Sequence, residues 1–326
     1  ARYASGLAEA EGRDLSLHLV TNGVLLTPET IFRLDDLGFS LTVSLDGPPA
    51  YHNKIRPSAD GTSSFRATAR ALHLMTGLPI GQRVTVRGTF TRRSAEFAPF
   101  AKFLLRMGFS RNLAYEPVFL PSGNPLAIRW SDLPSIKASY VELAHSYADA
   151  WKRGEPFCLW DFDDALIQLA LGCPRQSRCG AGVTGLALTA GGDVYACHMS
   201  TGMRDAWLGN LEAGLAEERR RPWHERYLRG RGGCSNCWLE KLCGGGCSAH
   251  SLLYNNAFAL PYRLECSLIE HRYRLAFWIL SEVEGLREMV QHCYSKMSQA
   301  RNSGHFTVPL WFHADQMYCP GHLAGA

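Results

Sequence analysis

Four cysteines fall within fourteen residues of this chain, at Cys234, Cys237, Cys243 and Cys247. A protein chain rarely gathers so many soft ligands unless a metal holds the thiolates together. Other cysteines flank this run, namely Cys173, Cys179 and Cys197 upstream and Cys266 downstream. Eight thiolates make two four-ligand sites. Iron–sulfur clusters and structural zinc both accept four cysteines, so at this point the spacing leaves both open.

Composition limits the remaining possibilities. The chain has 326 residues, of which 46% are hydrophobic and 20% charged, as in a globular protein of one or two domains. A formal net charge of +4 is too small to favour a nucleic-acid partner, and the basic run Arg219–Arg221 is expected at a solvated helix end. The sequence contains no long apolar span and no signal-peptide pattern. We therefore expect no membrane association and a reducing cytoplasm, where cysteines bind metal more often than they pair.

The first half of the chain alternates between strand and helix patterns. Strands are expected at 15–21, 40–45, 83–90 and 112–119, and helices at 27–37, 64–75, 94–107 and 133–151. Such alternation predicts an α/β fold with a parallel sheet, here a partial (β/α) barrel in which function gathers at the carboxyl ends of the strands. Residues 1–13 resemble the end of a helix, and the first residue is Ala1. We therefore expect a fragment whose barrel begins upstream.

The alternation is expected to stop after Glu155, where a small cysteine-rich domain begins. This domain should contain a hairpin formed by 185–190 and 193–197, joined by Gly191-Gly192. A long helix is expected over 264–299, followed by a tail over 301–326. The predicted domains are 1–154 for the barrel, 155–270 for the cysteine-rich part, and 271–326 for the helix and tail.

The cysteine pattern resembles a known domain. Cys173-x5-Cys179, Cys197, Cys234-x2-Cys237-x5-Cys243-x3-Cys247 and Cys266 are similar to the SPASM domain that follows the barrel in radical S-adenosylmethionine (SAM) peptide-modifying enzymes. The barrel half agrees independently, through Thr21-Asn22-Gly23, Ser44-Leu-Asp-Gly-Pro48, Arg56 and Gly61-x2-Ser64-Phe65. A match to the cysteine ladder together with these upstream motifs is far more specific than a lone CxxC.

Other segments narrow the resemblance. Val86-Arg-Gly-Thr-Phe-Thr91, Tyr115-Glu-Pro-Val118, Cys179-Gly-Ala-Gly182 and Val194-Tyr-Ala-Cys-His198 look like the maturases that install thioether crosslinks in ribosomal peptides, the SCIFF type, and like amine dehydrogenase subunit maturases. The resemblance covers most of residues 15–285. It does not account for the tail.

The resemblance implies two auxiliary [4Fe–4S] clusters. Cys173, Cys179, Cys197 and Cys247 would hold one cluster, and Cys234, Cys237, Cys243 and Cys266 the other. The interleaved sets also give a reason for Gly244-Gly245-Gly246, because backbone passing between two clusters needs residues that lack Cβ and accept positive φ. Two structural zinc sites are the alternative. The leftover thiols Cys158, Cys293 and Cys319 are expected to be incidental.

The cluster that binds SAM in this superfamily uses a CxxxCxxC loop, which this sequence does not contain. The nearest pattern, Cys243-x3-Cys247-x2-His250, reuses two auxiliary ligands and is not that loop. We expect the third cluster in the missing N-terminal part. A homologue that has lost SAM is the alternative.

Several residues are candidates for binding SAM because they lie at expected strand ends: Thr21, Asn22, Ser44, Asp46, Arg56 and Arg87. The alternative is structural, with Asn22-Gly23 and Asp46-Gly47 as turns and Arg87 as an ion-pair partner. Glu116, at the last expected strand end, is a candidate for contact with the substrate.

His198 follows Cys197 at a position where the resemblance separates two reactions. In sulfatase-maturing relatives this residue is an Asp that acts as the base, whereas the thioether-forming relatives have His. Imidazole can accept a proton near neutral pH, so His198 is a candidate catalytic base. A hydrogen bond beside a cluster is the other reading. The tail histidines, His305, His313 and His322, are expected at the surface.

The resemblance as a whole implies a radical SAM peptide maturase that installs a crosslink, expected to be a Cys thioether. Its partners would be a substrate peptide or small protein subunit and an external electron donor of flavodoxin or ferredoxin type. The alternatives are an anaerobic sulfatase maturase that forms formylglycine, and a peptide-binding scaffold without SAM.

Overall fold

The computed structural model describes residues 1–109, 112–172, 174–175, 177–229, 232–257 and 260–291. The chain forms two compact units. Within the described residues, unit 1 comprises 1–118, 131–170 and 275–291, and unit 2 comprises 119–130 and 171–274. Each unit is therefore built from separate stretches of sequence. The domain boundaries expected at 154 and 270 stay a prediction.

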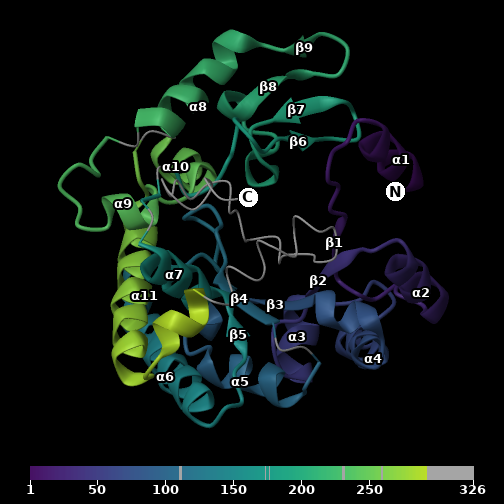
Figure 1. Ribbon diagram of the computed structural model, residues 1–326, viewed down its shortest axis with the longest axis vertical. Helices are drawn as coiled ribbons and strands as arrows, with labels where there is room; N and C mark the ends of the chain where they lie inside the picture. Colours follow the sequence, from purple (N-terminus) through teal and green to yellow (C-terminus); the bar gives the residue numbers. More distant parts are fainter. Residues whose placement is uncertain (110–111, 173, 176, 230–231, 258–259, 292–326) are drawn as a thin grey trace. The chain divides into compact units, whose positions relative to one another are not determined.

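Unit 1 contains a five-stranded sheet in the order β1-β2-β3-β4-β5, and every neighbouring pair is parallel. The strands are β1 (His18–Thr21), β2 (Ser40–Ser44), β3 (Val84–Phe90), β4 (Asn112–Pro117) and β5 (Cys158–Leu159). The helices are α1 (Arg2–Ala10), α2 (Pro28–Asp36), α3 (Pro49–Ile55), α4 (Ser64–Thr76), α5 (Ala98–Arg106), α6 (Leu133–Lys152) and α7 (Trp160–Leu171). Figure 1 shows α3, α4 and α5 on the same side of the strands.

The predicted alternation of strands and helices is confirmed up to α6, with small shifts at the ends. Thr27 caps α2 as expected, because its hydroxyl accepts a hydrogen bond from the Thr30 N–H at 3.2 Å. The expectation that alternation stops after Glu155 is wrong. β5 pairs in parallel with β4 and leads directly into α7, so the sheet continues for one more strand. A two-residue strand is too short to give a period of its own.

The core of unit 1 is an aromatic cluster on the face of the sheet that α5 and α6 cover. Phe90 of β3 stacks on Phe97 at 4.2 Å between ring centroids, and Phe97 stacks on Tyr115 of β4 at 5.3 Å. Tyr140 of α6 meets Phe97 edge to face at 4.9 Å. All four rings are fully buried. Pairs in these geometries add about 0.5–1.5 kcal/mol each beyond the burial of their area.

Unit 2 contains a four-stranded antiparallel sheet in the order β6-β7-β8-β9. Its strands are β6 (Ala187–Leu188), β7 (Asp193–Tyr195), β8 (Trp207–Asn210) and β9 (Gly214–Leu215), and its helices include α8 (Glu217–Arg229), α9 (Glu240–Cys243) and α10 (Ser248–Asn255). The expected hairpin is confirmed, because β6 and β7 pair directly. Arg219–Arg221 lie near the start of α8. Trp223 packs with Ala196, Ala206 and Leu208 in the core of this unit.

The helix expected over 264–299 is shorter than predicted. Helix α11 (Arg263–Glu282) ends before Gly285, which has a φ of 71°. A residue with positive φ ends a right-handed helix, and residues 286–291 are helical again. The rest of the predicted helix, the tail 301–326 with its histidines, and Cys173, Cys293 and Cys319 lie outside the described residues.

Over the described ranges no helix is both long enough and apolar enough to cross a membrane.

Candidate functional site

The sheet of unit 1 has one apolar and one polar face. Along β2, Leu41 and Val43 are fully buried, whereas Ser40, Thr42 and Ser44 alternate with them and point to the opposite face. The register continues the polar face into β3, because Thr42 pairs with Thr85 and Ser44 pairs with Arg87. Parallel strands are usually apolar on both faces. The polar residues on this face are therefore candidates for a site.

His18 of β1 belongs to the polar face. Its Nδ1 lies 2.9 Å from the Ser40 hydroxyl and its Nε2 lies 3.0 Å from the Thr42 hydroxyl. Burial lowers the pKa of His18 to about 4. The imidazole is therefore neutral at physiological pH and joins the first two strands through hydroxyl groups.

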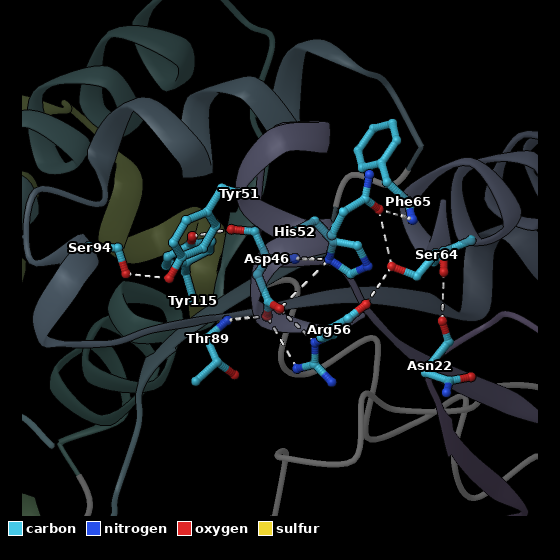
Figure 2. Close-up of polar contacts among 12 residues, drawn as sticks. Asn22, Asp46, Tyr51, His52, Arg56, Ser64, Phe65, Thr89, Ser94 and Tyr115 are labelled. Carbon is cyan, nitrogen blue, oxygen red and sulfur yellow. Dashed lines mark hydrogen bonds and ion pairs between the residues drawn. The ribbon is translucent and has the colours of Figure 1, made fainter. Parts of the chain in front are cut away.

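Asp46, just beyond β2, is the centre of the polar network in Figure 2. Its carboxylate accepts hydrogen bonds from Arg56 Nε at 2.5 Å, Arg56 Nη2 at 3.2 Å and the Thr89 N–H at 2.9 Å. Asp46 is fully buried, whereas about a third of the Arg56 side chain is exposed. The paired contact fixes the guanidinium and leaves some of its N–H donors for another acceptor.

His52 of α3 and Tyr115 of β4 complete this network. The Asp46 N–H donates to His52 Nδ1 at 3.1 Å, and the Tyr115 hydroxyl donates to the Asp46 carbonyl. Burial lowers the pKa of His52, opposed by Asp46, and burial raises the pKa of Tyr115 well above its usual value. Both side chains therefore stay neutral. Neither side chain was predicted as a site residue, although His52 lies four residues before the candidate Arg56 in the sequence.

The loop after α3 is tied to the start of α4. The Asn53 side-chain oxygen accepts the Phe65 N–H at 2.9 Å, and the Ser64 hydroxyl donates to the Arg56 carbonyl at 2.6 Å. These contacts use the Ser64-Phe65 motif to hold the backbone that carries Arg56. Figure 2 shows Ser64 and Phe65 beside the Asp46 network.

Thr21 and Asn22 form the turn that ends β1. The Thr21 hydroxyl accepts the Gly23 N–H at 3.0 Å, and the Asn22 side chain accepts the Val24 N–H at 3.1 Å. Gly23 has a φ of 77°, and a Cβ at this position would lie 3.0 Å from the Thr68 methyl group. Both predicted SAM ligands thus have local structural partners at the carboxyl edge.

Arg87 of β3 and Glu116 of β4 form an ion pair on the polar face. Both side chains are partly exposed, Arg87 by 40% and Glu116 by 28%. If one of them binds a ligand, water can therefore still solvate the charge of the other. Ser44, half-buried, lies opposite Arg87 in the register. The structure thus brings Ser44, Arg87 and Glu116 together at the carboxyl end of adjacent strands, while Asp46 and Arg56 bind each other.

The cysteines of unit 2 fall into two neighbourhoods. Burial, chiefly, raises the pKa of the Cys247 thiol, and Glu265, Cys179 and Cys197 lie close enough to raise it further. Burial likewise raises the pKa of Cys266 to about 12, with contributions from Cys243, Glu265 and Cys234. None of these six cysteines forms a disulfide, and neither does the exposed Cys237. Each neighbourhood contains three residues of one of the two four-cysteine sets that the resemblance implies, and the ligand sets themselves stay a prediction.

The loop after Cys243 is shaped by three glycines in the left-handed region. Gly244, Gly245 and Gly246 have φ values of 66°, 83° and 69°, which confirms the conformation expected for them. A Cβ on Gly244 would lie 2.4 Å from the Ser177 carbonyl carbon, so two backbone segments meet there. The N–H groups of Gly245 and Gly246 donate to the Cys243 thiol, although burial outweighs them and raises its pKa.

The turn after Cys197 supplies donors to a second thiol. The Ser200 hydroxyl lies 3.5 Å from the Cys197 sulfur, and Ser200 is fully buried in the short 3-10 helix η4 (His198–Ser200). His198 is exposed at the start of this turn. N–H and O–H donors at cysteine sulfur favour its thiolate form, which is the form that ligates a metal.

Glu265 joins the two neighbourhoods and was not predicted as a site residue. Its carboxylate accepts the Cys247 N–H at 3.2 Å and contacts His250 Nδ1 at 3.2 Å. Burial raises the pKa of this carboxyl, but His250 and the Cys247 N–H together outweigh burial and hold it below its usual value. Its position directly before Cys266 was the one signal in the sequence.

The donor chemistry of unit 2 fits iron–sulfur clusters. Thiols gather in two groups, backbone N–H groups donate to the Cys243 sulfur, and the Ser200 hydroxyl donates to the Cys197 sulfur. Donors of this kind favour the thiolate form that ligates a cluster. Among the described residues, no three His, Cys, Asp or Glu side chains stand close enough to hold a single metal ion. Cys173 lies outside the described residues, so the first set of four is described only in part.

Known proteins resemble this chain in sequence. No protein-family model matches it. It is 26% identical over 267 residues to the serine-type anaerobic sulfatase-maturating enzyme of Klebsiella aerogenes, covering 77% of this chain and 61% of the relative. The Klebsiella pneumoniae enzyme of the same description is 25% identical over 268 residues, covering 77% and 62%. The chain thus spans about three fifths of the length of these relatives.

Solved structures resemble it in fold. Native anSMEcpe with bound AdoMet and the Cp18Cys peptide aligns with a TM-score of 0.71 at 18% identity, covering 87% of this chain and 82% of that one. SuiB of Streptococcus suis aligns with a TM-score of 0.50 at 15% identity, covering 78% and 60%. These solved structures share with the chain an α/β fold that contains a parallel sheet.

Proposed function

We propose that the protein is a radical SAM/SPASM enzyme that modifies a peptide or a small protein subunit. One observation carries the proposal: the thiols of unit 2 gather as Cys179, Cys197 and Cys247 in one place and as Cys234, Cys243 and Cys266 in another. With Cys173 and Cys237 added by resemblance, each group reaches the four thiolates that a [4Fe–4S] cluster needs. The bound AdoMet and peptide of the anSMEcpe structures support both a SAM cofactor and a peptide substrate.

The polar face of unit 1 is the proposed SAM and substrate site. Arg56, held by Asp46, has N–H donors left for the SAM carboxylate, while Ser44 and Arg87 lie at the same edge of the sheet. Thr21 and Asn22 keep their places as candidates at the end of β1. SAM and a further cluster, when bound, would supply the abstraction of a hydrogen atom from the substrate. Glu116, paired with Arg87, is the candidate for orienting that substrate.

The proposed product is a Cys thioether. Joining a thiol to a carbon removes two hydrogen atoms from the substrate: one leaves carbon as a hydrogen atom, and the other leaves as the thiol proton and one electron. The exposed His198 is the candidate for accepting the proton near neutral pH. An auxiliary cluster would take the electron, and a flavodoxin or ferredoxin would exchange electrons with the enzyme.

Formylglycine formation on a sulfatase is the second candidate. It is favoured by the Klebsiella relatives, which are described as serine-type anaerobic sulfatase-maturating enzymes. His198, in place of the Asp that the resemblance assigns to sulfatase maturation, favours the thioether instead. The two reactions differ in product, so one measurement separates them.

Cofactor content is the first test. The chain, with the upstream part of its gene, is purified and reconstituted without oxygen, and iron, sulfide and zinc are measured. We expect about four irons for each of three clusters, and 5′-deoxyadenosine when SAM and a reductant are added. Cys243→Ser should lose about one cluster of iron, whereas Cys158→Ser, at an exposed thiol outside both groups, should keep the wild-type amount. Zinc in place of iron would refute the proposal.

Product analysis is the second test. The protein is co-expressed with a small Cys-rich peptide encoded beside its gene, and separately with a sulfatase peptide. A thioether appears as loss of two hydrogens with a thiol that no longer alkylates, whereas formylglycine appears as an aldehyde at a Cys or Ser. Cluster binding without any 5′-deoxyadenosine would point instead to the scaffold without SAM chemistry.

A further inference from the structure

Glu265 is a buried acidic residue at the point where the two cysteine groups meet. It lies in the first turn of α11, directly before Cys266, and is only 9% exposed. Both of its carboxylate oxygens lie within hydrogen-bonding distance of the Cys247 N–H, at 3.2 and 3.3 Å. Cys247 belongs to the first cysteine group and Cys266 to the second. One side chain thus links the loop of one group to the helix of the other.

The surroundings of Glu265 are built to hold a carboxylate. His250 Nδ1 lies 3.2 Å from Oε2, and the His250 ring stacks on Phe119 at 3.4 Å between centroids, which restricts how the imidazole can turn. A Cβ on Gly246 would lie 3.4 Å from Oε2, so a larger residue there would crowd the carboxylate. Arg178 is also near enough to stabilise the charge. A buried carboxylate without such partners would be strongly destabilising.

We propose that Glu265 is a positioning residue that fixes the Cys247 loop against the Cys266 helix and places one negative charge beside both auxiliary clusters. This inference rests on the proposed function, because it requires that the two cysteine groups hold clusters. Glu265 ligates neither cluster. It accepts a hydrogen bond from the backbone N–H of the proposed ligand Cys247, and it directly precedes the proposed ligand Cys266 in the sequence.

The physical consequence concerns both assembly and redox potential. Reducing a cluster adds an electron, and a nearby buried negative charge opposes that addition more strongly than it would in water. Removing the charge while keeping the shape should therefore make both clusters easier to reduce. Removing the side chain altogether should free the Cys247 loop and weaken the binding of both clusters.

The experiment compares three variants of the reconstituted chain. Glu265→Gln keeps an oxygen that can accept the Cys247 N–H, Glu265→Ala removes it, and Glu282→Gln is the matched control at an exposed glutamate on the same helix. Iron content is measured first, and the midpoint potentials of the two auxiliary clusters are then followed by redox titration with electron paramagnetic resonance. We expect wild-type iron and more positive potentials for both clusters in the Gln variant, and reduced iron in the Ala variant.

The outcomes separate this inference from the proposed function. A wild-type chain without iron–sulfur clusters refutes the proposed function. A wild-type chain with clusters, together with Glu265 variants that match it in iron and in both potentials, refutes only the inference. A shift confined to one cluster, or an equal change in Glu282→Gln, also refutes it. Wild-type iron in the Gln variant, iron loss in the Ala variant and an unchanged Glu282→Gln support it, because Gln keeps an oxygen that can accept the Cys247 N–H.

Discussion

Replacing Asp46 tests whether the polar network of unit 1 is held together by a buried charge. Asp46→Asn keeps the shape of the side chain and an oxygen for the Thr89 N–H, but it removes the negative charge that faces Arg56. Asp46→Ala removes both contacts. The two variants therefore separate the effect of the charge from that of the hydrogen bond.

The size of each effect follows from burial. Removing one partner of a fully buried ion pair costs about 3–5 kcal/mol, but Arg56 is 34% exposed and can be partly hydrated once Asp46 is gone. We therefore expect about 2–3 kcal/mol for Asp46→Asn, below the range for a fully buried pair. The Ala variant leaves the Thr89 N–H without its acceptor, which adds about 1–3 kcal/mol. The order of stability should be wild type, then Asn, then Ala.

Urea unfolding, followed by tryptophan fluorescence and by circular dichroism, measures these differences. Asp60→Asn is the matched control, because Asp60 is exposed and accepts its hydrogen bonds from nearby residues of the same loop, chiefly Thr62. The control should unfold at the same urea concentration as wild type. If the urea midpoint of Asp46→Asn also equals that of wild type, the charge of Asp46 does not hold Arg56 in place, and the backbone contacts of Arg56 must position it.

Two other predictions concern pH and backbone conformation. His18 has a folded pKa of about 4, below its unfolded value of 6.5. Its contribution to the free energy of unfolding is therefore complete above pH 6.5 and is lost as pH falls toward 4. The shift corresponds to about 3 kcal/mol, reduced to about 1–2 because the side chain is partly exposed to solvent, and His18→Gln should flatten the unfolding free energy between pH 7 and pH 4.5. Gly244→Ala should lower the iron content well below wild type, because alanine is strained at a φ of 66° and its Cβ would lie 2.4 Å from the Ser177 backbone. Gly232→Ala, at a position with negative φ and open space, is the control, and equal iron in both variants would contradict the prediction.

Local sequence signals predicted the elements of the fold but not the contacts between them. The helix periods, the Thr27 cap and the glycine run each depend on residues close in sequence, and each agrees with the structure. β5 was missed because its two residues carry no period, and α11 was predicted too long because a single Gly285 ends it.

The candidate site was predicted less completely, for a physical reason. Arg87 and Glu116 were identified separately, and Arg87 was considered as an ion-pair partner, but only the register of β3 and β4 brings the two together. The choice of Arg56 as the partner of Asp46 depends on how α3 turns after β2, which no short-range pattern encodes. Glu265 and His250 depend likewise on the approach of α10 and α11.

The two-faced sheet has a consequence for how this protein can change over time. Because neighbouring residues of a strand point in opposite directions, Val43 and Val86 serve the aromatic interior while Ser44 and Arg87 serve the site. A substitution at Ser44 or Arg87 therefore changes the polar face of the sheet without opening a cavity in the interior. Along each strand, the residues that stabilise the fold alternate with those on the polar face, so the polar face can change during evolution while the buried residues are kept.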